Sequence, residues 1–135
     1  MKLWIGRICT LTVLLWNVQC ALLFLLYPAE YSSGFELSGV SGQVFVQGLG
    51  FLFLMWNVPY IIAALNPIKW RTSLIEASIM QAIGFLGEQW LLYKLPDGHL
   101  LLQATLSRFI FFDGAGVVLL IVAIFVSYGK KIYQN

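Results

Sequence analysis

Four apolar stretches, each of 20 residues or more, divide this chain of 135 residues. They cover about residues 3–26, 42–65, 72–95 and 101–128, and each ends at a proline or glycine beside polar residues. About 20 apolar residues in an α-helix cross the ~30 Å hydrocarbon core of a bilayer, and proline and glycine are common helix stops. The sequence therefore predicts an all-α fold, a single integral membrane domain over residues 1–135 built as a four-helix bundle.

The composition agrees with a lipid environment. Hydrophobic residues make up 60% of the chain and charged residues only 10%, whereas a soluble domain carries about 25% charged residues. The net charge is +2 and the basic residues form no stripe, which does not fit a nucleic-acid surface. We expect the lipid bilayer as the main partner and no nucleic acid.

The basic residues predict an orientation. They fall at the N-terminus, in the second connection and at the C-terminus: Lys2, Arg7, Lys69, Arg71, Lys130 and Lys131. The first connection, residues 29–41, has two glutamates and no lysine or arginine. By the positive-inside rule both termini are cytoplasmic. We expect a multi-pass protein of the cell inner (plasma) membrane, and we interpret the first stretch as an uncleaved helix because it is long enough to span.

Two local features refine the helices. Pro59 lies inside the second stretch and is expected to kink it, because proline removes a backbone N–H. The third connection is short, so the third and fourth helices are expected to be adjacent and antiparallel. That arrangement puts Glu88 level with Arg108, and Asp113 level with Gly84 or Phe85. His99 falls in the turn and is interpreted as a solvated loop residue.

Charged side chains inside the apolar stretches are the strongest indication of a site. Glu88 lies in the third stretch, and Arg108 and Asp113 lie in the fourth. Ionised groups at such depth are costly and usually have a partner or a function. The expected level of the two helices predicts a Glu88–Arg108 ion pair. Asp113 has no obvious cation nearby in the sequence.

Amide side chains add to this polar group. Gln81 shares a helix face with Glu88, while Asn17 and Gln47 lie in the outer halves of the first and second stretches. One interpretation is a pocket for a hydrophobic or amphipathic small molecule, or a proton-accepting site at Asp113 or Glu88. The other is purely structural, with interhelical hydrogen bonds worth about 1 kcal/mol each. The candidate ligand-binding residues are Asn17, Gln47, Gln81, Glu88, Arg108 and Asp113.

Motifs for established chemistry are absent from the sequence. There is no glycine-rich phosphate loop, no HExxH and no Ser/His/Asp order. The two cysteines are eleven residues apart, too far to bridge along one helix, and no CxxC is present. We therefore predict no metal site, assign no catalytic residues and name no cofactor.

Several motifs carry a resemblance to a known family. Gly48-Leu49-Gly50 lies in the second stretch, and Glu76-Ala77 and Gly84-Phe85-Leu86-Gly87 lie in the third. With four short-looped helices, this pattern resembles the DoxX-like small membrane proteins. The resemblance implies a four-helix bundle that sometimes partners quinone-linked redox enzymes.

Three functional hypotheses follow. The first is a non-enzymatic membrane protein that binds a hydrophobic or amphipathic ligand, a lipid or a quinone for example, in a polar cavity near the outer leaflet. The second is an accessory subunit of a larger membrane complex, for example a quinone-linked redox complex, or a homo-oligomer. Its motivation is the small size of the chain, with almost no extramembrane domain, and the small-residue faces Gly84/Gly87 and Gly114/Gly116. The third, and least favoured, is an intramembrane acid–base enzyme using Glu88 and Asp113.

Overall fold

The computed structural model describes residues 1–128, and every regular element in that range is helical. The all-α prediction is therefore confirmed for this part of the chain, whereas Lys130 and Lys131 lie outside the described residues. The elements are α1 (Lys2–Leu26), α2 (Pro28–Ser32), the 3₁₀ turn η1 (Ser33–Phe35), α3 (Gly39–Trp56), α4 (Val58–Leu65), α5 (Arg71–Lys94) and α6 (Leu100–Tyr128).

The second predicted stretch is divided into α3 and α4 at Asn57, two residues before Pro59. Pro59 occupies the first turn of α4, where its missing N–H costs no helical hydrogen bond. The buried Asn57 closes α3, because its backbone N–H and its side-chain Nδ2 both donate to the carbonyl of Phe53, at 3.2 and 2.6 Å. The stretch is therefore divided beside Pro59, where a kink in one continuous helix was predicted.

Three helical segments among the described residues are long and apolar enough to cross a membrane: Lys2–Leu26, Gly39–Leu65 and Leu100–Tyr128. The more polar helix α5 is not one of them. Outward faces carry large apolar side chains, such as Phe111 and Phe125 of α6, which are 71% and 75% exposed. Apolar surface of this extent is typical of a lipid-facing protein.

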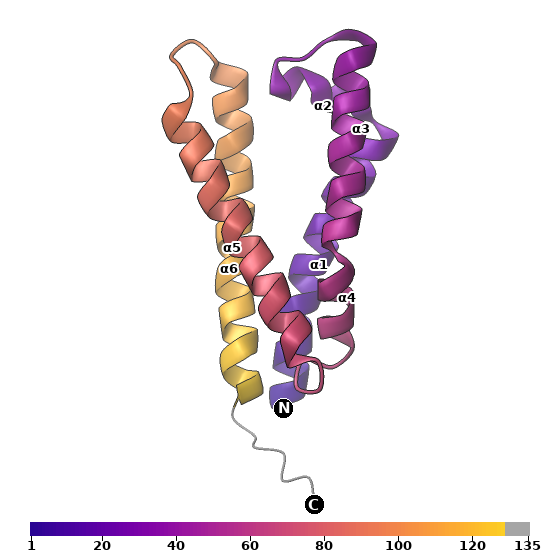
Figure 1. Ribbon diagram of the computed structural model, residues 1–135, viewed down its shortest axis with the longest axis vertical. Coiled ribbons are helices and arrows are strands. Elements are labelled where there is room, and N and C mark those ends of the chain that lie inside the picture. Colours follow the sequence, from indigo (N-terminus) through magenta and orange to yellow (C-terminus); the bar gives the residue numbers. More distant parts are fainter. Residues whose placement is uncertain (129–135) are drawn as a thin grey trace, which may run out of the picture.

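The helices form two pairs. Helix α1 packs on α3, and α5 packs antiparallel on α6, as their short connection predicts. Figure 1 shows that the pairs converge near the N-terminus and diverge toward the end that carries α2. Helix α5 leans across, contacting α6 and, near its start, α4. We call the converging end the closed end and the other the open end.

The closed end holds the hydrophobic core. Its buried members come from α1, α4, α5 and α6: Cys9, Val13, Tyr60, Ala63, Leu74, Ala77, Leu120 and Ala123. Two arginines bind backbone carbonyls at helix C-termini there, Arg7 Nε that of Leu65 at 2.9 Å and Arg71 Nη2 that of Ser127 at 2.7 Å. Basic side chains satisfy carbonyls that a helix end leaves unpaired. This end is therefore closed by both packing and capping.

Candidate functional site

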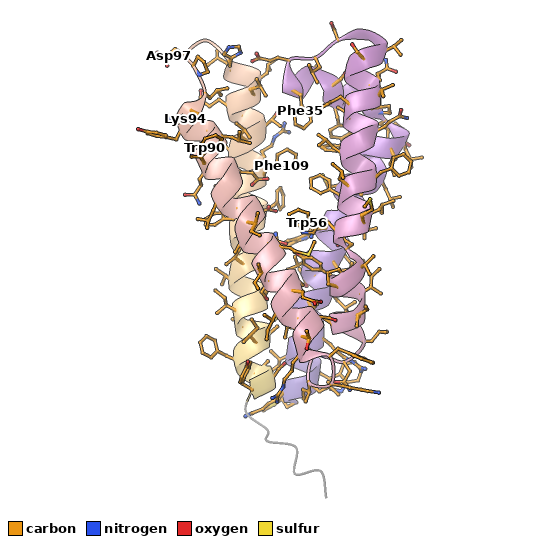
Figure 2. All side chains as sticks on the ribbon, viewed as in Figure 1. Phe35, Trp56, Trp90, Lys94, Asp97 and Phe109 are labelled. Atoms are coloured by element: carbon orange, nitrogen blue, oxygen red, sulfur yellow. The ribbon has the colours of Figure 1, made fainter. Side chains whose placement is uncertain are left out.

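A cavity of about 240 Å³ lies between the two helix pairs toward the open end. Its lining comes from α1, α2, η1, α3, α5 and α6, and it includes the side chains of Phe35 and Phe109. Figure 2 shows these two residues in the space where the pairs diverge, with Trp56 nearer the closed end. Ligand pockets are about 300–1,000 Å³, so this cavity suits a small molecule or one part of a larger one.

Phenylalanine rings form much of the cavity wall. Phe24 of α1 is 3% exposed, and its ring centroid lies 5.8 to 6.2 Å from those of Phe35, Phe53 and Phe109. On the α1–α6 side, Trp16 meets Phe112 edge to face at 5.8 Å. Such aromatic contacts are favourable beyond the apolar area that they bury. The wall is therefore apolar and well packed, although it surrounds open space.

Polar side chains from α1, α4, α5 and α6 meet at Gln81, which is 2% exposed. Gln81 Nε2 donates to Asp113 Oδ1 at 2.9 Å. Gln81 Oε1 accepts from the Tyr60 hydroxyl at 2.5 Å and from Asn17 Nδ2 at 3.5 Å. Buried polar groups are stable when they are paired in this way. We call Asn17, Tyr60, Gln81 and Asp113 the polar hub.

Two glycines make room for the hub between α5 and α6. A Cβ on Gly84 would come within 2.5 Å of Asp113 Oδ2, and a Cβ on Gly116 within 2.7 Å of Gln81 Nε2. Close helix approach at small residues is common in membrane bundles. The contact also confirms that Asp113 lies level with Gly84.

The predicted Glu88–Arg108 ion pair is wrong. Both residues line the cavity, yet no ion pair joins them in the described part of the chain. Arg108 Nη2 instead donates to Thr105 Oγ1 at 3.3 Å, while Glu88 Oε2 is buried without a hydrogen-bond partner among residues 1–128. The hydroxyl of Thr105 lies one turn away on the same helix, so Arg108 finds an acceptor without reaching α5.

A cap made of residues 28–36 lies across the open end of the cavity, where Tyr31, Gly34 and Phe35 contribute to the lining. Thr105 Oγ1 donates to the Gly34 carbonyl at 2.8 Å, which joins the cap to α6. Glu36 Oε2 contacts His99 Nδ1 at 2.5 Å, and Glu36 Oε1 accepts from the Leu102 N–H at 3.4 Å. The cap is thus attached to the α5–α6 pair through two of its residues, Gly34 and Glu36.

His99 is an exposed loop residue, as predicted, and it also has a partner. Its side chain is 45% exposed but forms an ion pair with Glu36 when it is protonated. The hydrogen bond from His99 lowers the pKa of the Glu36 carboxyl from its ordinary value, with smaller contributions from backbone N–H donors. A loop–loop contact of this kind depends on the tertiary fold and leaves no local signal in the sequence.

The six candidate residues are not all in one place. Asn17, Glu88, Arg108 and Asp113 line the cavity, and Gln81 lies behind Asp113 in the hub. Gln47 does not line it: its Nε2 donates to the Leu25 carbonyl at 3.3 Å, at the contact between α3 and the end of α1. Gln47 thus satisfies a helix-end carbonyl on the neighbouring helix.

Residues absent from the sequence prediction supply most of the lining. On each of α1 and α6, four lining residues recur at the spacing i, i+3, i+4, i+7, which marks one helix face. They are Trp16, Gln19, Cys20 and Leu23 on α1, and on α6 Thr105, Phe109 and Phe112 together with Arg108, the one predicted member of the eight. That periodicity was a usable signal, although nothing in it distinguishes a cavity wall from a packed core. No group of three or more potential metal ligands occurs among the described residues.

Compared with known proteins, the chain matches no family model, no curated protein and no solved structure. The DoxX-like resemblance therefore stays a prediction.

Proposed function

We propose that this chain is a small membrane protein that holds a hydrophobic or amphipathic small molecule in the cavity between its two helix pairs. The observation that carries the proposal is the cavity itself, about 240 Å³ with phenylalanine walls and a polar hub at one side. A mostly apolar pocket with a few convergent polar groups is the usual form of a small-molecule site.

We also propose that α5 spans the bilayer, completing a four-helix bundle in a cell inner membrane with both termini cytoplasmic. Helix α5 has 24 residues, about 36 Å at 1.5 Å per residue, and packs along α6. The basic residues Lys2, Arg7, Lys69 and Arg71 lie at the closed end, as the positive-inside rule requires of a cytoplasmic side.

Maleimide labelling in intact cells tests this orientation. Lys69→Cys and Asp97→Cys are made in a background in which Cys9 and Cys20 are replaced by alanine. We expect a membrane-impermeant maleimide to label the cysteine at position 97 and not the one at position 69. Equal labelling of both, or labelling at position 69 alone, contradicts the proposed topology.

The binding proposal is tested by native mass spectrometry of protein gently extracted from its own membrane. We expect a mass above that of the polypeptide by one small molecule. Phe109→Trp narrows the cavity and is expected to remove the extra mass. Phe111→Trp makes the same change on the lipid-facing side and should retain it. Bare polypeptide from the wild-type protein, or equal retention by both variants, contradicts the proposal.

We prefer the ligand-binding hypothesis to the accessory-subunit hypothesis because of how the glycines are used. Three of the four glycines that motivated it are used inside the chain: Gly84 faces Asp113, Gly114 faces Phe85 and Gly116 faces Gln81. Only Gly87 of this set has open space beside it. A single exposed glycine is a weak basis for a helix interface, so the ligand-binding hypothesis is preferred.

An acid–base enzyme is a second candidate, because one cavity reaches both Glu88 and Asp113. Two carboxylates in one cavity can exchange a proton with a bound molecule. The molecule recovered from the wild-type protein would then differ chemically from the one recovered from Asp113→Asn. Recovery of the same molecule from both proteins contradicts catalysis and leaves the binding proposal intact.

A further inference from the structure

The charged side chains of the cavity differ in their interaction partners. Three lining residues carry charge: Glu88, Arg108 and Asp113. No cation forms an ion pair with either carboxylate in the part of the chain that the structure describes. Asp113 has one amide donor, Gln81, and Glu88 Oε2 has no hydrogen-bond partner there. A nearby cation strongly stabilises the ionised form of a carboxylate that is removed from water.

Arg108 lies near the cap and forms no ion pair with either acid among the described residues. Its Nη2 donates to Thr105 Oγ1, whose own hydrogen goes to the Gly34 carbonyl. The same nitrogen lies 3.9 Å from the position that a Cβ on Gly34 would occupy. The guanidinium is thus hydrogen-bonded to the residue that attaches the cap to α6. Glu88 and Asp113 remain as the two acidic groups of the cavity lining.

Glu88 of α5 and Asp113 of α6 line the same cavity. Asp113 lies against Gly84 of α5, which is one helical turn from Glu88. Gln81 and Gly84 hold Asp113 in place between α5 and α6. A group that binds between the two carboxylates would reduce their mutual repulsion if it carried positive charge and increase the repulsion if it carried negative charge.

The aromatic wall also favours a ligand with positive charge. Trp16, Phe53, Phe109 and Phe112 line the cavity together with the acids. The face of an aromatic ring carries partial negative charge, so it attracts cations, especially where water is excluded. An alkylammonium group is attracted both by carboxylates and by ring faces, whereas an anionic head group is attracted by neither.

Resting on the proposed binding function, we infer that the molecule held in the cavity is a cationic amphiphile. Its amine or quaternary ammonium group lies between Glu88 and Asp113, and its apolar part lies against the aromatic wall. The small cavity volume limits the head group to a few heavy atoms and the apolar part to a short chain or a single ring.

Three probes of equal chain length test the sign of the charge. Hexyltrimethylammonium, hexanesulfonate and hexanol are titrated by calorimetry into the purified protein in lipid nanodiscs, after removal of any retained molecule. We expect hexyltrimethylammonium to bind at least tenfold more tightly than hexanesulfonate. Tighter or equal binding of the sulfonate overturns the inference.

Variants locate the binding. Glu88→Gln keeps the shape of the side chain, and Glu88 Oε2 has no hydrogen-bond partner among the described residues, so this variant should fold. We expect it to bind the ammonium probe at least tenfold more weakly and to bind hexanol as the wild-type protein does. Asp113→Asn should have the same effect if it folds, whereas Glu30→Gln, a carboxylate outside the cavity lining, should have none. An unchanged ammonium affinity in Glu88→Gln overturns the inference.

The results also separate this inference from the proposed function. Binding of hexanesulfonate at least as tight as that of hexyltrimethylammonium, lost in Phe109→Trp but not in Phe111→Trp, overturns the cationic assignment and supports a ligand-binding cavity. Absence of binding by all three probes, together with bare polypeptide in the native mass spectrum, overturns both.

Discussion

The closed and open halves of this protein are built from the same long helices, yet only one of them is filled. Near the N-terminus the helix pairs meet through small and branched residues such as Ala63, Ala77 and Ala123, all fully buried. Toward the cap the same helices diverge, and phenylalanine rings and a few polar groups surround a cavity. Close packing of small residues fixes the pairs at one end, so the other end can hold space without loss of the fold.

The hub lies at the boundary between the two halves. Tyr60 belongs to the closed-end core and also donates to Gln81, which in turn positions Asp113 at the cavity. The Asp113 carboxylate is therefore connected to the more closely packed half and lines the cavity of the open half. A site supported by a packed scaffold keeps its geometry when its occupant changes.

Truncation of a large side chain should lower the unfolding free energy far more in the closed half than in the open half. Leu120→Ala removes a fully buried side chain from the core, with an expected loss of about 2–5 kcal/mol of unfolding free energy. Leu23→Ala makes the same change at the cavity wall, where part of the side chain already faces open space, and should cost less. Unfolding in mixed micelles measures both. Equal losses would mean that the cavity is absent in the membrane-like environment.

Helix spacing within a pair gives the second test. Gly50 of α3 faces α1 so closely that a Cβ would lie 2.9 Å from the Ala21 carbonyl oxygen, whereas Gly48 has nothing within 4 Å. Gly50→Ala must push the helices apart and should cost about 1–3 kcal/mol. Gly48→Ala should be neutral or slightly stabilising, because alanine favours a helix. The same unfolding assay compares them, and a Gly50→Ala protein as stable as Gly48→Ala would contradict this packing.

These contacts show which features the sequence determines locally. The helices follow from apolar length and from Pro and Gly stops, and the break before Pro59 follows from the chemistry of one residue. The level of Asp113 with Gly84 follows from counting residues on two antiparallel helices. Each of these depends on neighbours in the chain or on one short connection, so each was predictable.

The features that the sequence did not predict depend on how the two helix pairs diverge. Residue counting placed Glu88 and Arg108 at similar depth, but the count could not indicate that Thr105 would accept from Arg108 instead. Gln47 has the same depth and polarity as a cavity residue, yet it faces α1. Rotation about helix axes and the position of the cap are non-local properties, so the aromatic wall and the Glu36–His99 contact were not predicted.

Removal of one hydroxyl group should weaken the connection between the two halves. Tyr60→Phe removes the donor to Gln81 Oε1 but leaves the ring in the core, with an expected loss of about 1 kcal/mol. Tyr93→Phe, at a side chain that is 82% exposed, should cost almost nothing. Because Gln81 also positions Asp113, Tyr60→Phe should weaken retention of the bound molecule in native mass spectra. Unchanged stability and retention would mean that the hub does not connect core and cavity.

The smallest expected effect is at the cap, where Glu36 contacts His99 outside the apolar segments. The folded state lowers the pKa of Glu36, so its carboxylate stabilises the attached cap at neutral pH, and this contribution is lost as the pH falls through the lowered pKa. Hydrogen exchange of the amides of residues 33–36 should therefore be faster in Glu36→Gln than in the wild-type protein at neutral pH. The two should converge in acid.

Glu30→Gln, on the same cap, serves as the control for this comparison and should behave like the wild-type protein at every pH. Exposed ion pairs contribute little to global stability, so the unfolding free energy should hardly change while the local exchange does. A change in local hydrogen exchange without a change in the unfolding free energy is expected if the open half can move without disturbing the closed half. If Glu36→Gln instead lowered global stability as much as Tyr60→Phe, the cap would be part of the core, and the two halves would unfold as one unit.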